Sequence, residues 1–223
     1  ILNPKDGKPI VTPSQDMVIG NYNLTMEESA ASLREEAARY REARCEDQAQ
    51  LWDTYADNEE HVFKEVNEVL MAYDQKVDHL HSRIAILAGA LKKTTFTEEQ
   101  NKMYLMTTVG KIIFNEMFPN DFPYLNEVSD ANFKATPEKF FIKPGENIKE
   151  IIANAPIVTE VKKKQLGLII AEIFARYSTK KTSEILDAIK DMGFKYSTVA
   201  GITVALSDIQ VVENKEEKIE EGK

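Results

Sequence analysis

The feature that most constrains the fold of this chain is the spacing of its apolar residues, which switches between two periods. Several stretches place apolar residues three or four positions apart, most clearly Leu166, Ile169, Ile170, Ile173, Phe174 and Tyr177. This spacing predicts helices that bury one face. An alternating pattern typical of strands occurs in Val77–Leu87, and shorter strands are expected at Leu105–Thr107, Lys139–Ile142 and Ile202–Leu206. We therefore predict an α+β fold with small mixed or antiparallel sheet elements, several packed helices and an inserted acidic helical segment.

Residues that favour helix starts predict where several helices begin. Thr12-Pro13-Ser14-Gln15 combines an N-cap threonine, a proline at the first helical position and a glutamine that can reach back to the cap. A helix is therefore expected from Pro13 to about Tyr22, with Met17 and Val18 facing inward. Thr25-Met26-Glu27-Glu28 and Thr97-Glu98-Glu99-Gln100 have the same order of residue types and predict two further helix starts.

A glycine predicts the end of a later helix. A helix over Lys181–Met192 would be followed by Gly193, which suits the left-handed position after a helix, and Phe194 would then fold back onto Ile189. The other expected elements are a hairpin at Asp6-Gly7, helices over Val62–Tyr73 and from Val109 to Met117, and a helix from about Glu213.

Residues 27–58 differ in composition from the rest of the chain. Acidic residues concentrate there, apolar residues are sparse, and opposite charges stand three or four positions apart, as in Glu35–Arg39 and Arg44–Asp47. This pattern favours a long solvated helix from Ser29 to about Thr54 with a narrow contact stripe. We expect the segment to stand off the remainder of the chain as a helix or a helical pair.

The overall composition argues against several functional classes. A net charge of −9 and a pI of about 5.0 do not fit a free-standing nucleic-acid binder, because phosphate binding requires clustered Lys and Arg. No apolar run approaches the roughly 18 residues of a membrane helix, so no membrane partner is expected. A single cysteine, Cys45, excludes an internal disulfide and a multi-thiolate metal site, and fits a cytoplasmic location. Because the chain does not begin with Met, we expect it to be processed or cut from a longer one.

The residues that could carry chemistry are few. The sequence has no glycine-rich phosphate loop, no His-Glu-x-x-His and no Gly-x-Ser-x-Gly elbow. His79 and His81 stand two apart on one predicted strand face with Arg83 beside them. They could supply two metal ligands or face a nucleotide. However, His61 lies in a different element and a third ligand is not evident, so a polar, partly buried sheet face is the simpler interpretation.

Gln15 and Asp16 are a second pair of candidates. Both could contact a ligand, but Gln15 is also explained as a helix cap and Asp16 as a charge that complements the helix dipole. From the residues alone we predict no catalytic residue, no cofactor-binding residue and no metal ligand in this chain.

Four stretches together resemble one family, the beta-prime subunit of bacterial DNA-dependent RNA polymerase. The first two are Asn3-Pro4-Lys5-Asp6-Gly7-Lys8-Pro9 with Val11 to Tyr22, and Val77-Asp78-His79-Leu80-His81-Ser82-Arg83. The third is Thr107 to Glu116 with Phe122-Pro123-Tyr124, and the last runs from Leu186-Asp187 through Met192-Gly193-Phe194 to Val204. Their order and separations match the family over nearly the whole chain except about Glu28–Asn58, which looks like an insertion.

The resemblance implies a non-catalytic role within a large enzyme. In this family the region lines the secondary channel, or pore, through which nucleoside triphosphates enter and the RNA 3′ end is extruded. Nucleotidyl transfer uses two magnesium ions, and the aspartate loop that holds them is expected upstream of Ile1. The implied partners are other polymerase subunits, template DNA, RNA and NTPs. No cofactor is expected in this segment, which should be inactive alone.

The resemblance also divides the chain. Residues 1–26 and 59–192 would form the pore domain, residues 27–58 the acidic helical insertion, and residues 193–223 the start of the funnel region with a truncated helix. Gln15 and Asp16 would lie nearest the catalytic loop, with His79, His81 and Arg83 behind them as pore-wall candidates. The alternatives are a free-standing α+β interaction module that docks through its acidic helix, and an autonomous enzyme with an unrecognised site.

Overall fold

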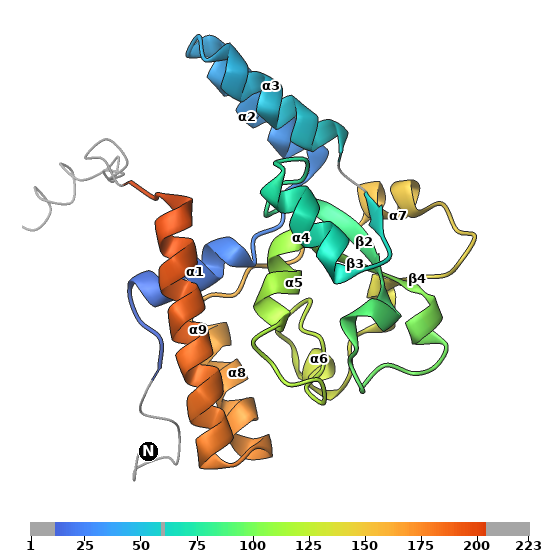
Figure 1. The fold of residues 1–223 in the computed structure, drawn as a ribbon, viewed down its shortest axis with the longest axis vertical. Coiled ribbons are helices and arrows are strands. Elements are labelled where there is room, and N and C mark those ends of the chain that lie inside the picture. Colours follow the sequence, from blue (N-terminus) through green and yellow to red (C-terminus); the bar gives the residue numbers. More distant parts are fainter. Residues whose placement is uncertain (1–11, 59–60, 204–223) are drawn as a thin grey trace, which may run out of the picture.

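The computed structural model describes residues 12–58 and 61–203, which form a mixed α+β structure (Figure 1). A small sheet and its helices make the body of the molecule, a helical layer flanks the body on one side, and a helical hairpin projects from it (Figure 1). The predicted fold class is confirmed. No helix in this described part combines the length and the apolar run that a membrane-spanning segment requires.

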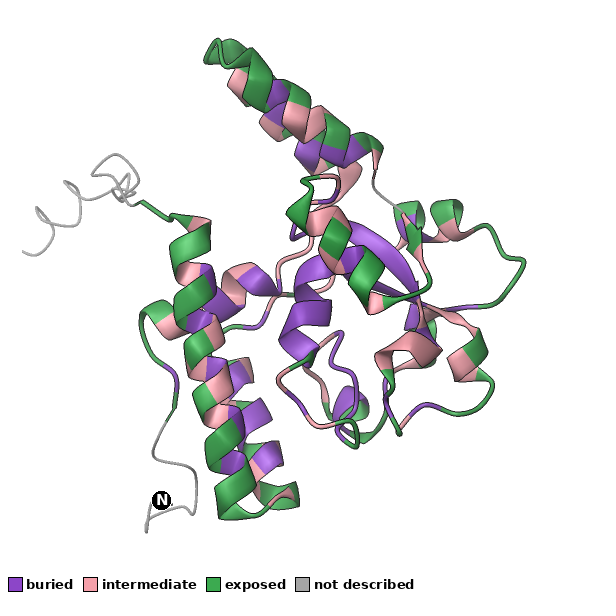
Figure 2. Ribbon diagram, viewed as in Figure 1, coloured by how far each residue is buried: buried purple, intermediate pink, exposed green. Residues whose placement is uncertain are grey.

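The sheet has the strand order β1-β2-β3-β4, with β1 Val62–Phe63, β2 Arg83–Leu87, β3 Tyr104–Thr108 and β4 Phe141–Ile142. β1 runs parallel to β2, whereas the β2–β3 and β3–β4 pairs are antiparallel. β2 and β3 are buried along almost their whole length (Figure 2), which explains why their residues are nearly all apolar rather than alternating. The predicted short strand at Leu105–Thr107 is confirmed, whereas only Phe141–Ile142 of the strand predicted over Lys139–Ile142 forms β4, because Lys139 and Phe140 belong to η3.

Helix α5, Val109–Asn115, follows β3 directly and is buried along its whole length. Thr108 caps it by accepting a hydrogen bond from the Lys111 backbone N–H. The other short helices around the sheet are α4 Val66–Asp74, η1 Ala88–Leu91, η2 Gln100–Lys102, α6 Asp130–Lys134, η3 Glu138–Phe140 and α7 Ile148–Asn154. One large apolar cluster connects these elements and forms the core of the body.

Three longer helices form the flanking layer: α1 Asp16–Leu24, α8 Lys163–Arg176 and α9 Thr179–Ala200. α8 buries the predicted face of Leu166, Ile169, Ile170 and Ile173. α1 crosses α9 (Figure 1), and Asn21 joins the two helices by donating to the backbone carbonyls of Met17 and Ile189.

The predicted helix end at Gly193 is wrong, because α9 continues through it to Ala200. Gly193 is buried against α1, and a Cβ added at Gly20 would lie only 1.7 Å from the Gly193 carbonyl oxygen. The glycine therefore permits close contact between the helices instead of ending one. Phe194 stays 47% exposed, and Gly201, with a φ of 55°, takes the left-handed position that was assigned to Gly193.

The acidic segment is a pair of antiparallel helices rather than one long helix. α2 covers Ala30–Glu42 and α3 covers Glu46–Asp57, and the turn between them contains Arg44 with a φ of 60°. Each apolar stripe is too narrow to be buried alone, and folding back lets the two stripes cover each other. The hairpin core is a small separate cluster of Leu33, Tyr55 and Ala56, with Ala30, Leu51 and Trp52 against it. This α2–α3 hairpin projects from the body (Figure 1).

Two of the three predicted capping boxes are wrong. α1 begins at Asp16, and Gln15 has a φ of 49° and makes no side-chain capping bond. Ser29, not Thr25, caps α2 by accepting from the Ser32 backbone N–H. The third box is confirmed, since Thr97 and Gln100 exchange side-chain-to-backbone hydrogen bonds of 3.0 and 3.1 Å before η2.

The strand predicted over Val77–Leu87 is half as long as expected. β2 begins only at Arg83, because the Ser82 hydroxyl accepts from the His79 backbone N–H and the Ser82 N–H donates to the His79 carbonyl, which closes a turn. The helix expected over Val62–Tyr73 begins at Val66, since Val62 and Phe63 form β1. The N-terminal hairpin, the helix near Glu213 and most of the strand Ile202–Leu206 lie outside the described residues.

Candidate functional site

The structure places the five sequence-predicted site residues on separate elements. Gln15 and Asp16 are exposed at the start of α1, and Gln15 holds a positive φ that few non-glycine residues adopt. Arg83 is the first residue of β2, is buried, and donates from Nη1 to the Ala155 carbonyl at 3.0 Å. His79 and His81 lie in the turn before β2, and their side chains do come together.

A glutamate that the sequence did not single out completes this group. Glu28 Oε2 lies 3.4 Å from His81 Nδ1 and 3.8 Å from His79 Nδ1. One ligand atom from each of the three side chains lies within 4.8 Å of the other two. We call Glu28, His79 and His81 the histidine cluster. Glu28 is therefore the acidic side chain closest to the two histidines in the described part of the chain.

Backbone contacts hold Glu28 in place. The Glu28 N–H donates to the His81 carbonyl at 3.1 Å, and Glu28 pairs with Ser82 in an isolated parallel bridge. The chain between α1 and α2 thus runs beside the turn that carries both histidines. Because such pairing joins residues far apart in sequence, residue spacing alone could not predict it.

Aromatic side chains from α3 cover the histidine cluster on one side. The Trp52 and Tyr55 rings lie 4.8 and 5.2 Å from the His79 ring, and the His79 and His81 rings meet edge to face at 4.7 Å. A pocket of about 520 Å³ opens beside the cluster and is also lined by Tyr73, Asp74 and the end of α9. The base of the hairpin and the body therefore meet at this site.

Burial controls the charge of the cluster. Burial, together with the neighbouring His81, lowers the pKa of His79 to about 4, while Glu28 opposes the shift. Burial also raises the pKa of Glu28, but the close polar contact with His81 and the charges of His81 and His79 outweigh it, so the net shift is downward. At neutral pH the cluster thus combines a carboxylate with a neutral His79 imidazole.

His81 is the most buried member of the histidine cluster. Its side chain is 8% exposed, and within the described part of the chain neither ring nitrogen has a hydrogen-bond partner of good geometry. Its closest polar neighbour is the Glu28 carboxylate at 3.4 Å. The remaining histidine, His61, is held elsewhere by the buried Asp78, with Nδ1 3.0 Å from Oδ2.

A second polar contact lies next to the cluster and was also missed from sequence. Glu27, adjacent to Glu28, accepts a 2.8 Å hydrogen bond from the Lys111 Nζ on α5. Both side chains are almost fully buried, at 4% and 3% exposure. Two neighbouring glutamates that resembled cap residues therefore make long-range buried contacts in different directions.

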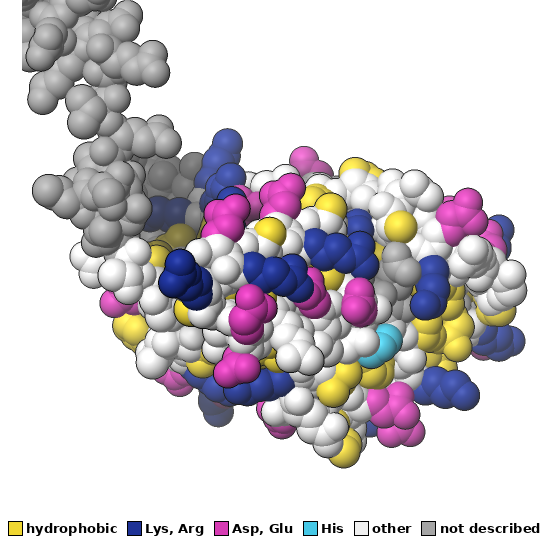
Figure 3. Space-filling model, turned by 90° about the horizontal axis from the view of Figure 1, so that it is seen from above, with side chains coloured by type: hydrophobic (Ala, Val, Ile, Leu, Met, Phe, Trp, Pro, Cys, Tyr) yellow, Lys and Arg dark blue, Asp and Glu magenta, His cyan; other side chains and the backbone are white. Residues whose placement is uncertain are grey.

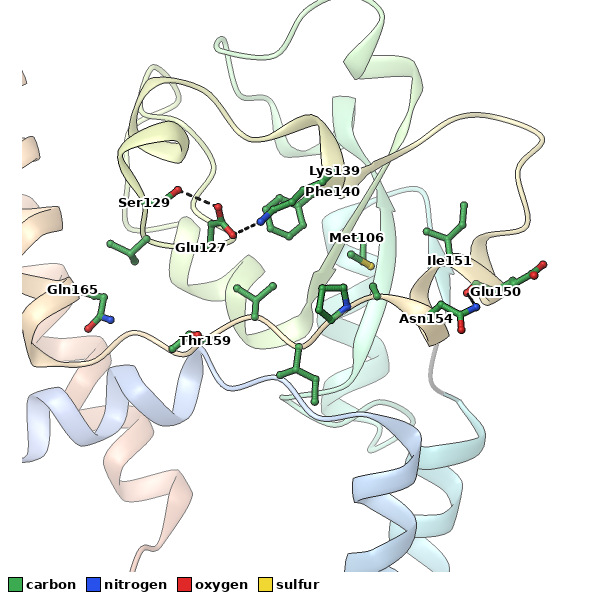
Figure 4. A pocket seen from close by; sticks show the side chains of 15 residues that line it. Met106, Glu127, Ser129, Lys139, Phe140, Glu150, Ile151, Asn154, Thr159 and Gln165 are labelled. Carbon is green, nitrogen blue, oxygen red and sulfur yellow. Dashed lines mark hydrogen bonds and ion pairs between the residues drawn. The ribbon is translucent and has the colours of Figure 1, made fainter.

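A second pocket, of about 810 Å³, lies on another part of the body (Figure 4). Phe140, Ile151 and Met106 give it an apolar lining, and Glu127 pairs there with Lys139 and accepts from the Ser129 hydroxyl. None of the five predicted site residues is among the described residues that line it. It is an apolar hollow beside β3 and β4, separate from the histidine cluster.

The chain belongs to the family described as RNA polymerase Rpb1, domain 3, whose family model matches residues 1–209. It is similar over its whole length to DNA-directed RNA polymerase subunit beta' of Geobacillus kaustophilus and of Bacillus anthracis, each 50% identical over 223 residues. The subunit of Bacillus subtilis is 48% identical over the same length. The chain spans 16% of each of these relatives. The resemblance found in the sequence motifs is thereby confirmed.

Proposed function

We propose that this chain acts in transcription as a segment of a beta-prime-type subunit of a DNA-directed RNA polymerase. The observation that carries the proposal is the match to subunit beta' of other bacteria along the whole chain at about half identity. The match includes residues 27–58, which form the α2–α3 hairpin. Partners of the segment would be the other subunits of the polymerase.

We further propose that the segment forms part of the wall of the secondary channel, through which NTPs enter and the RNA 3′ end leaves. A wall must be rigid, and the large apolar core with its buried charges supports that requirement. The exposed start of α1, with Gln15 and Asp16, is the surface we assign to the channel. Template DNA, RNA and NTPs would contact the parent complex.

In this proposal the magnesium ions of the parent enzyme are held by a different part of the subunit. Two-metal nucleotidyl transfer requires a site rich in carboxylate oxygens. The one group of three potential ligands among the described residues contains two imidazoles and a single carboxylate. The segment would support the catalytic centre without supplying its ligands, and we expect the isolated chain to incorporate no nucleotide.

Cross-linking from the RNA 3′ end tests the channel assignment. In a polymerase assembled with a subunit that contains this chain, Cys45 is replaced by serine and a single cysteine is introduced by Gln15→Cys. A backtracked complex with a thiol-reactive group on the RNA 3′ end should label this position. Ser178→Cys at the start of α9 is the matched control and should remain unlabelled. Equal labelling of both positions, or labelling of neither, contradicts the assignment.

The second candidate is a free-standing interaction module that docks through the α2–α3 hairpin, which the projection of the hairpin from the body favours (Figure 1). The face of the molecule that Figure 3 shows carries interspersed basic and acidic side chains. Such a mixed surface is suited to weak polar contacts. The extent of the reading frame that encodes this chain distinguishes the two functions. A reading frame that continues on both sides supports the polymerase segment, whereas a short frame beginning near Ile1 supports the module.

A further inference from the structure

We propose that Glu28, His79 and His81 bind a divalent transition-metal ion of the zinc type. The ion would join the segment that enters the α2–α3 hairpin to the turn that precedes β2. The site is additional to the magnesium centre of nucleotidyl transfer and does not depend on the channel assignment.

The separations between the ligand atoms suit such an ion. Zinc bound to histidine nitrogen and carboxylate oxygen has bonds of about 2.0 to 2.2 Å, so tetrahedral ligand atoms stand about 3.4 Å apart. His81 Nδ1 and Glu28 Oε2 are already 3.4 Å apart, and His79 Nδ1 lies 3.8 Å from the same oxygen. All three ligand atoms lie within 4.8 Å of one another, so coordination of one ion requires the His79 ring to move closer to the other two ligands.

Several ligand atoms of the site are buried and lack a hydrogen-bond partner in the described part of the chain. His81 Nδ1, His81 Nε2 and Glu28 Oε2 are buried, and no protein group in the described chain makes a well-formed hydrogen bond with any of them. Burying a polar atom without a partner is unfavourable, and a bound cation would remove that penalty. Among the residues that the structure describes, the His81 backbone N–H competes for His79 Nδ1, at the long distance of 3.4 Å.

The charge of the site and the space beside it also favour metal binding. The Glu28 carboxylate supplies one negative charge, and the pocket of about 520 Å³ beside the cluster has room for a water molecule as the fourth ligand.

The donor set predicts selectivity. Imidazole ligands suit zinc, cobalt, nickel and copper, whereas magnesium and calcium prefer sites made entirely of oxygen. A site with two imidazoles and one carboxylate should therefore bind Zn²⁺ and Co²⁺ and discriminate against Mg²⁺. Its position between the hairpin and the body gives the ion a structural role.

The only tryptophan of the chain provides a direct readout. The Trp52 ring lies 4.8 Å from the His79 ring, so Co²⁺ bound at the cluster should quench Trp52 fluorescence. Titration of the 223-residue chain carrying Cys45→Ser, which removes the exposed thiol, should give saturable quenching with one ion per chain. Zn²⁺ should reverse the quenching by displacing Co²⁺, and Mg²⁺ at the same concentration should not.

Three variants locate the binding. Glu28→Gln removes the anionic ligand, and His79→Phe removes a ligand but keeps an aromatic ring against Trp52. Each should weaken Co²⁺ and Zn²⁺ binding by at least about tenfold, since disturbing even the outer partners of a ligand costs that much. His61→Gln is the matched control and should bind as the parent chain does, because His61 pairs with Asp78.

Two outcomes overturn the proposal. One is a folded parent chain whose Trp52 fluorescence shows no saturable response to Co²⁺ and whose melting temperature is unchanged by Zn²⁺. The other is binding that His61→Gln weakens as much as His79→Phe does, which would assign the ion to scattered surface histidines. Neither result would affect the polymerase assignment, because that assignment rests on family membership.

Discussion

The body of the molecule and the α2–α3 hairpin use charged residues in opposite ways. In the body, Lys111 and Glu27 pair at 2.8 Å while almost completely buried. In the hairpin, Arg34 and Asp57 pair at 3.2 Å with side chains 59% and 71% exposed. Both contacts are ion pairs between one basic and one acidic side chain, yet buried pairs are costly to break and exposed pairs contribute little. The buried charged pair therefore helps to specify the structure of the body, whereas the exposed charged side chains mainly keep the surface of the hairpin hydrated.

The largest expected effect comes from removing one partner of the buried pair. Lys111→Met should leave the Glu27 carboxylate buried without a counter-charge and lower the free energy of unfolding by about 3 to 5 kcal/mol. Urea denaturation followed by circular dichroism measures the loss. The double variant Lys111→Met with Glu27→Gln should recover much of it, because no uncompensated charge remains. A loss below 1 kcal/mol in the single variant would remove the contrast between body and hairpin.

The body and the hairpin also differ in how closely their helices approach. The hairpin helices pack through buried alanines such as Ala37 and Ala49, whereas α1 meets α9 through Gly20 and Gly193. Gly20→Ala would place a Cβ 1.7 Å from the Gly193 carbonyl oxygen, and because the obstacle is backbone, the helices must separate. We expect a loss of about 3 kcal/mol in the free energy of unfolding.

Gly167→Ala in α8 is the matched control for this substitution. A Cβ at Gly167 would have no heavy atom within 4 Å, so alanine should raise helix stability by up to about 1 kcal/mol. Thermal melting of both variants separates close packing from helix propensity. Similar melting temperatures for the two variants would mean that α1 and α9 do not depend on this contact.

Gly193 also illustrates what the sequence could not predict. The spacing of apolar residues located β3, α5 and α8, because each follows from neighbours a few positions away. A glycine after a run of helical residues can either end the helix or allow another helix to pack closely against it. For Gly193, only the position of α1 decides between the two. The sequence left open whether the acidic segment is one helix or a helical pair for the same reason, since the partner of each apolar stripe is the other stripe.

The candidate site was half predictable. His79 and His81 were selected because two histidines stand close in sequence, although the strand begins only at Arg83 and a turn before it brings the two side chains together. Glu28 gave no signal, because its place in the cluster depends on a backbone bridge to Ser82. Gln15 and Asp16 remain predictions for the channel wall, and their exposure is compatible with that role.

A pH-dependent effect should also be confined to the body. Lys93 is buried, donates to the carbonyls of Asn115, Phe118 and Pro119, and burial lowers its pKa to about 8. Between pH 8 and 10 the unfolded chain therefore keeps a proton on this lysine that the folded chain has lost, and stability rises with pH. The contribution should be about 2 kcal/mol across this interval.

Lys93→Met isolates this contribution. The variant should lack the rise that the parent chain shows between pH 8 and 10, when both are unfolded by urea at several pH values. The comparison of slopes cancels groups that titrate equally in both chains. If the free energy of unfolding changes with pH equally in both chains, Lys93 is not desolvated. The charge of this lysine would then be solvated, as the charges of the hairpin are.

The smallest effect is expected in the hairpin. Arg34→Ala removes the exposed pair with Asp57, and solvent screening limits the cost to about 0.5 kcal/mol or less in the free energy of unfolding. The same result is expected at low and at high salt, because little Coulomb energy is present to be screened. Urea denaturation in both buffers measures it, with Lys111→Met as the buried reference. A loss above about 2 kcal/mol would mean that this pair is shielded from water, and the contrast between hairpin and body would then fail at its simplest point.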